Sequence, residues 1–243
     1  LCFAEADYLI NLANLKSHGS AGVTLCGKNH FGSLVRWPVQ QGYYSMHRNS
    51  FSKATRAYRE QVDLMGHSHL GGKTLLYVID GLYPGKHSVE RVPRKWELPP
   101  FRGRWASSLL ASQDPVAIES VGFDLMQLEG DPRRYPQMAG VDDYLHEAAL
   151  AHDPPSGTFY DPDHDGDVER LPSLGVHEHW NDPVAMQYSR NLGTGDGIEL
   201  VRWWASVSDV PEARGGFASH GYPNPFNPRT VIRFELAAAG MVT

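Results

Sequence analysis

Alternation between apolar strand-like runs and segments of helical period is the feature that most constrains how this chain folds. Residues 8–12 and 74–79 are short apolar runs that suit strands buried on both faces, and residues 107–112 form a weaker third run. After the third run, Asp114 can cap a helix that begins at Pro115 and repeats apolar residues at helical spacing. This order predicts an α/β fold in which a mostly parallel or mixed sheet is flanked by helices.

The rest of the chain is organised less sharply. Residues 53–65 and 142–151 have the apolar spacing of two further helices, the second capped by Asp142. Proline, glycine and aspartate accumulate over residues 153–197, which predicts a loop-rich C-terminal part, with one strand after it at 198–204. The chain starts without methionine or a signal segment and stops seven residues after a strand-like run, so we interpret it as a fragment cut at both ends.

Composition and charge exclude several classes of protein. The 243 residues are 41% hydrophobic, which excludes wholesale disorder, and no apolar run reaches the roughly 18 residues that span a bilayer. The net charge is -6 and no dense basic stretch occurs, so nucleic acid is not expected as a partner. Cys2 and Cys26 are too few for a thiolate cluster, and the sequence leaves open whether they form one disulfide or stay reduced.

Polar side chains follow the three predicted strands. Lys16 and His18 come after the first, Asp80 ends the second and Asp114 follows the third. Ligands of open α/β sheets bind beyond the carboxyl ends of strands, so we expect these side chains to line one crevice with Lys28, which lies in a glycine-flanked segment. The cations suit a carboxylate or phosphate, and the carboxylates suit a divalent cation or proton transfer. The alternative is structural, with each carboxylate only a cap or turn residue and each lysine only solvated.

Three segments resemble the signature elements of domain-of-unknown-function family 362. Asn11–His18, Gly22–Gly32 and Ala111–Ala117 are similar to its Lys-Thr-His-like, Thr-x-x-x-Lys-Asn-x-x-Gly and Ser-x-Asp-Pro-x-Ala elements, in that order. The resemblance covers residues 5–130, with an expected extent to residue 210. It implies an α/β domain over residues 1–216 that lacks its N-terminal part, while naming no reaction. Many relatives carry ferredoxin-like cysteine clusters, which this sequence lacks, so no iron–sulfur cluster is expected. The acidic residue that the family places after Asp-Pro corresponds to Glu119.

The segment from Tyr222 to Leu236 resembles the opening of the C-terminal sorting domain that the type IX secretion system reads. Its prolines suit an extended lead-in, and its last six residues alternate as a strand does. The resemblance implies that residues 217–243 begin a truncated sorting domain, that the type IX secretion machinery is a partner, and that the protein is secreted or lies at the outer-membrane surface. An oxidising exterior would permit a disulfide between Cys2 and Cys26. The alternative is a proline-rich tail that ends in an edge strand.

Alternating carboxylates over residues 161–169 predict a calcium-binding turn around Gly166. The oxygen ligands would come from Asp161, Asp163, Asp165, Asp167 and Glu169. Pro172 stands where an EF-hand has its bidentate glutamate, so we expect a calcium turn of another type. The alternative is an acidic surface loop.

His177 and His179 flank Glu178, which places both imidazoles on one side of an extended segment at a spacing compatible with metal binding. The helical His-Glu-x-x-His zinc motif is absent, and we interpret the segment as a solvated loop that holds two histidines. No serine-hydrolase elbow and no phosphate loop occur in the sequence.

Two classes of function remain open. The first is a secreted or cell-surface enzyme that acts on an anionic small molecule with metal assistance, in which Lys16, His18 and Lys28 hold the anion while Asp80 or Asp114 binds the metal or moves a proton. The second is a non-catalytic ligand-binding or scaffold protein with structural calcium. Convergence of these five side chains in one pocket would favour the first class, and their dispersal would favour the second.

Overall fold

The computed structural model describes residues 2–19, 21–33, 56–85, 95–97, 99, 101–129, 139–164, 166, 169–202, 218–222 and 231–235. The chain divides into two compact units, Leu1–Leu200 and Val201–Thr243. In the second unit, β5 (Ala218–Tyr222) and β6 (Val231–Glu235) pair as antiparallel strands. This pairing confirms the expected strand over residues 231–235, and Leu236 lies outside the described residues.

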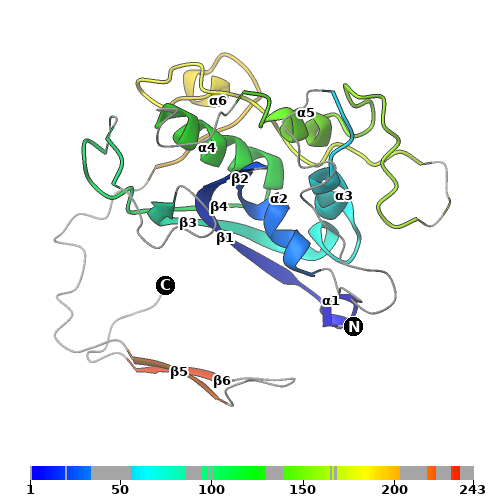
Figure 1. The fold of residues 1–243 in the computed structure, drawn as a ribbon, viewed down its shortest axis with the longest axis horizontal. Helices are drawn as coiled ribbons and strands as arrows, with labels where there is room; N and C mark the ends of the chain where they lie inside the picture. The colour runs from blue at the N-terminus through cyan, green and yellow to red at the C-terminus, as the bar shows by residue number, and fades with distance from the viewer. Residues whose placement is uncertain are drawn as a thin grey trace. The chain divides into compact units, whose positions relative to one another are not determined.

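The first unit is built on a four-stranded mixed sheet of order β2-β1-β3-β4 (Figure 1). The long central strands β1 (Leu9–His18) and β3 (Thr74–Gly85) are parallel, as expected for an α/β fold. The edge strands β2 (Gly22–Thr24) and β4 (Ser108–Ser112) are both antiparallel to their neighbours. The expected fold class, α/β with a mixed sheet and flanking helices, is therefore confirmed.

Helix α4 (Pro115–Leu128) packs on the sheet and begins where the sequence predicts it. The Asp114 carboxylate accepts hydrogen bonds from the backbone N–H groups of Val116 and Ala117, at 2.9 and 2.8 Å, and Pro115 takes the first helical position. The helix approaches the sheet closely at Gly122, where a Cβ atom would lie 3.3 Å from the side chains of both Ile79 and Leu25. A larger residue there would separate the two layers.

Further helices lie on the same side of the sheet as α4 (Figure 1). They are α2 (Cys26–Asn29), α3 (Glu60–Gly66), α5 (Asp143–Ala149) and α6 (Ser189–Leu192). The chain also forms a short helix α1 (Cys2–Glu5) before β1 and the 3-10 turns η1 (His30–Ser33) and η2 (Gly71–Lys73). None of the helices in the described part of the chain is long and apolar enough to cross a membrane. Cys2 is exposed, Cys26 is buried, and both are free thiols.

Three local expectations differ from the structure. The first strand is not buried on both faces, because Ile10 and Leu12 are 67% and 61% exposed on the side of the sheet that the described helices leave open. The helix expected over 53–65 begins only at Glu60, after an extended residue; residues 53–55 lie outside the described residues. Residues 198–202, expected as a strand, have no regular structure, and Trp203 and Trp204 lie outside the described residues.

Candidate metal centre

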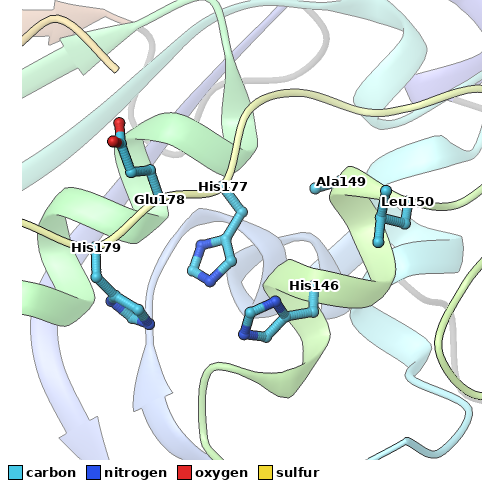
Figure 2. A pocket seen from close by; sticks show the side chains of 6 residues that line it. All are labelled: His146, Ala149, Leu150, His177, Glu178 and His179. Carbon is cyan, nitrogen blue, oxygen red and sulfur yellow. The ribbon is translucent and has the colours of Figure 1, made fainter. Parts of the chain in front are cut away.

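Four side chains gather beside the N-terminus of α5. Asp142, His146, His177 and His179 each offer one ligand atom, and these atoms all lie within 4.8 Å of one another. Two of the residues belong to α5 and its cap, and two belong to the loop-rich segment that follows. Figure 2 shows the three imidazoles turned toward a common space.

Asp142 occupies the N-cap position of α5, but its side chain makes no capping hydrogen bond. Its carboxylate oxygen Oδ2 instead lies 3.5 Å from Nε2 of His146, one helical turn along the chain, and 3.3 Å from Nε2 of His179. Burial alone would raise the pKa of Asp142, yet the hydrogen bonds from His146 and His179 hold it below its usual range. The residue that the sequence marks as a cap thus serves the histidine cluster.

Helix α4 positions the other two histidines through a match of spacing. Ser120 and Asp124, four residues apart on the helix, are separated by a rise of roughly 6 Å, and residues two apart in an extended segment are separated by roughly 6.7 Å. His177 Nδ1 accordingly lies 2.9 Å from the Ser120 hydroxyl, and His179 Nδ1 lies 2.7 Å from Asp124 Oδ1. Each ring therefore directs its Nε2 edge away from α4 and toward α5.

The hydrogen bonds of Ser120 select the tautomer of His177. The serine hydroxyl donates its hydrogen to the carbonyl oxygen of Val116 at 2.7 Å, so toward His177 its oxygen accepts from Nδ1–H. Nε2 then carries a lone pair, and this buried atom has no hydrogen-bond partner among the described residues. Burial, and next the charges of His146 and His179, lower the pKa of His177 to about 3, so the ring is neutral. A neutral imidazole with an unused Nε2 is the form that binds a metal ion.

Asp124 holds His179 in the same way. The carboxylate is buried and also accepts hydrogen bonds from the backbone N–H of Trp180 at 3.1 Å and the hydroxyl of Tyr188 at 2.9 Å. Hydrogen bonds to Asp124 and Asp142 raise the pKa of His179 to about 10. A carboxylate on the far nitrogen of a ligating histidine is the usual support of a metal ligand, because it fixes the ring orientation and increases its basicity.

Two of the distances between potential ligand atoms match tetrahedral coordination. Metal–nitrogen and metal–oxygen bonds of about 2.0–2.2 Å place neighbouring tetrahedral ligand atoms about 3.4 Å apart. The two separations between Asp142 Oδ2 and the imidazole nitrogens, 3.3 and 3.5 Å, already have this length. Small side-chain rotations would bring the whole set, now within 4.8 Å, to the same spacing.

The residues expected to line a crevice are only partly brought together. Lys16 and Lys28 lie near enough to interact electrostatically. Burial, and next the charge of Lys16, lower the pKa of Lys28. Thr24 pairs with Lys16 across β1 and β2 and has a buried hydroxyl without a hydrogen-bond partner. His18 is buried, and its Nδ1 accepts a hydrogen bond from the N–H of Ala21 at 3.1 Å. Anion binding by this group stays a prediction.

Only one of the two carboxylates of the expected crevice lies remote from Lys16. Asp80 pairs with Asn14, two residues before Lys16 in β1, and accepts a hydrogen bond from the N–H of Leu82 at 2.9 Å. Lys16 is level with Gly85 at the carboxyl end of β3, whereas Ser112, at the end of β4, is level with Tyr77 near the other end. Asp114 follows Ser112, so it lies on the order of 20 Å from Lys16 along the sheet. The expected convergence assumed parallel strands, and β4 runs antiparallel.

Asp114 helps to position the segment that contains His177 and His179. Its second carboxylate oxygen accepts a hydrogen bond from the N–H of Val176 at 3.0 Å, immediately before the two ligating histidines. The helix cap therefore also anchors the start of the segment that lies along α4.

The predicted calcium turn is described only in part, because Asp165 and Asp167 lie outside the described residues. The Asp163 carboxylate accepts a hydrogen bond from the Ser68 hydroxyl at 2.8 Å and lies 3.3 Å from Nδ1 of His67. Calcium binding by Asp161, Asp163 and Glu169 with these two residues stays a prediction.

Comparison with known proteins gives the family of the chain. Residues 2–124 match the family described as Domain of unknown function (DUF362). The chain belongs to this family. No curated protein and no solved structure matches it. The matched range of this DUF362 protein includes Ser120 and Asp124, whereas the four potential ligands lie beyond residue 124, so family membership does not account for the cluster.

Half of the cluster is recognisable in the sequence of this DUF362 protein. His177 and His179 alternate there, but on local grounds the segment is interpreted as a solvated loop. Asp142 and His146 form a second pair at helical spacing, which is the signal that could have completed the set. Nothing in the sequence states that the two pairs, more than thirty residues apart, meet in space.

Proposed function

We propose that this DUF362 protein is a metalloprotein that binds one divalent first-row transition ion, best matched by zinc, between α5 and residues 177–179. The observation that carries the proposal is the set of three imidazoles and one carboxylate within 4.8 Å, whose rings are held by Ser120 and Asp124. Metal sites typically draw their ligands from separate segments, and further side chains hydrogen-bond the far nitrogens of the ligating histidines, as Ser120 and Asp124 of α4 do here.

The ligand types favour a transition ion over calcium or magnesium. Calcium and magnesium take oxygen ligands, whereas imidazole suits zinc, copper, iron and nickel. Three imidazoles with one carboxylate match the tetrahedral preference of zinc. When bound, such an ion would act as a Lewis acid toward an oxygen ligand.

An ion-pair network alone explains only part of the arrangement. A protonated His179 between Asp124 and Asp142 would account for three of the side chains. It leaves the buried Nε2 of His177 without a partner. A shared metal ion would give this nitrogen a partner, and it would also use the His146 ring, whose centroid lies 4.3 Å from that of His177.

Zinc binding by the full chain tests the proposal. Isothermal titration of the chelator-treated protein should show one zinc site, and elemental analysis should find one zinc per chain after dialysis. His177→Ala should weaken zinc binding by more than about 100-fold, beyond the roughly 10–100-fold typical of second-shell changes. His152→Ala, which removes an exposed histidine outside the cluster, is the matched control. Equal zinc affinity of His177→Ala and His152→Ala would overturn the proposal.

We also propose that the protein is exported through the type IX secretion system to the cell exterior or the outer-membrane surface. The resemblance of residues 222–236 to a sorting-domain opening supports this, and the β5–β6 pairing is compatible with it. Immunodetection in the culture fluid and outer-membrane fraction of the native host tests it. Retention in the cytoplasm of a secretion-competent strain would contradict it.

A further inference from the structure

The candidate metal centre is open on one side. A pocket of about 300 Å³ adjoins it and is lined by His146, Ala149, Leu150, His177, Glu178 and His179 (Figure 2). The three imidazoles border the pocket, and Asp142 is not one of its lining residues. An exchangeable ligand that enters from the pocket would add to the four protein ligands and make the ion five-coordinate.

The net charge of the metal centre determines which charge the exchangeable ligand should have. A divalent ion with three neutral imidazoles and one carboxylate keeps a net charge of about +1, so it favours one monoanion. The described residues that line the pocket include neither lysine nor arginine, which leaves the metal as the attractive charge. Glu178 does not oppose the anion directly: Figure 2 shows its carboxylate turned away from the imidazoles, and it accepts hydrogen bonds from the N–H groups of Ser189 and Ile198 at 3.0 and 2.8 Å.

The wall beside the imidazoles is apolar. Ala149 and Leu150, at the end of α5, line the pocket, and Leu150 is 45% exposed. An exposed leucine next to a charged centre gives a ligand with an alkyl group a surface to cover. A ligand with an anionic head and a short aliphatic tail uses both features of the pocket.

The lining offers little for activating water. Apart from the three ligating imidazoles, Glu178 is the single ionisable group among the described lining residues, and hydrogen bonds hold its carboxylate away from the imidazoles (Figure 2). A general base must lie within hydrogen-bond reach of the proton that it removes. The described pocket therefore favours coordination of an anion over hydrolysis by a metal-bound water.

We infer that the pocket takes a small aliphatic monocarboxylate, whose carboxylate coordinates the metal as a fifth ligand from the pocket side and whose alkyl group packs on Ala149 and Leu150. This inference rests on the proposed metal centre. It places the anionic small molecule expected from the sequence at the imidazole cluster.

Cobalt substitution tests the metal centre and the inference separately. Co²⁺ bound by the full chain should give visible absorption bands of a four-coordinate ion, and titration with acetate, propanoate and butanoate should change them. Each added CH2 that packs on the wall should tighten binding about fourfold, the factor that corresponds to burial of one methylene group. Azide, which has no alkyl group, serves as the inorganic reference anion.

Leu150→Asp supplies the matched variant. It places a negative charge in the pocket and removes the apolar wall, so it should weaken butanoate binding about tenfold or more while the cobalt bands persist. Val184→Asp, which changes a side chain that is 94% exposed and does not line the pocket, is the control and should bind butanoate as the parent does.

The possible outcomes are distinguishable. Absence of cobalt bands would overturn the metal centre itself. Cobalt bands that no carboxylate changes would leave the metal centre intact and overturn the inference in favour of a closed structural site. Bands that respond to acetate and azide, without dependence on chain length or on Leu150→Asp, would overturn the aliphatic part of the inference. Carboxylate affinity that rises about fourfold with each CH2, and that Leu150→Asp makes independent of chain length, would support the whole of it.

Discussion

Ser120→Ala tests how much one hydrogen bond to a ligating histidine contributes to zinc affinity. Ser120 is completely buried, its hydroxyl donates to Val116, and its oxygen accepts from His177 Nδ1 at 2.9 Å. Alanine fills nearly the same space and is the better helix former, so the metal-free protein should keep its stability to within about 1 kcal/mol. The substitution removes the acceptor that selects the Nδ1–H tautomer of His177.

The expected effect on zinc affinity follows from that loss. A neutral hydrogen bond contributes about 0.5–1.5 kcal/mol, and second-shell changes weaken metal binding about 10–100-fold. We expect zinc to bind Ser120→Ala about tenfold more weakly, which corresponds to about 1.4 kcal/mol. Competition with a chromophoric chelator measures the Kd, and thermal unfolding of the metal-free proteins measures stability. Ser173→Ala, an exposed serine outside the cluster, is the control. A Kd within twofold of the parent would refute the tautomer reasoning.

Four further predictions concern other parts of the chain. Asp124→Asn should weaken zinc binding about 10–100-fold in the same chelator assay, because an amide cannot replace both carboxylate oxygens toward His179, Trp180 and Tyr188. Burial raises the pKa of Glu119 to about 7, so the protonated form stabilises the folded state fully below about pH 4.5, and this stability is lost as the pH rises through 7. Urea unfolding of the metal-free protein should show a loss on the order of 1–3 kcal/mol in the free energy of unfolding over this range, and Glu119→Gln should show no such loss. Calcium should raise the Tm, and an Asp163→Ala, Asp165→Ala double variant should abolish the heat of calcium binding in calorimetry. Deletion of residues 217–243 should change the Tm by less than about 5 °C, and a larger drop would show that this tail belongs to the core domain.

The sequence alone determined the elements whose signals are local. The run from Asp114 through Leu128 contains its own cap, its first-turn proline and its apolar period, and α4 follows it residue for residue. The apolar runs likewise marked β1, β3 and β4, and the proline-rich region after residue 153 contains only a four-residue helix among its described residues. These predictions succeeded because each depends on neighbours within a few positions along the chain.

Tertiary structure decided which chemical groups meet. The direction of β4 depends on its pairing with β3 and not on its own residues, and that direction places Asp114 at the end of the sheet remote from Lys16. The same packing brings the segment 177–179 against α4 and toward α5, so that Asp142, which its local sequence marks as a helix cap, turns its carboxylate to His146 and His179. A helix cap and a metal ligand have the same residue type and the same local sequence, and only the neighbours supplied by folding distinguish them.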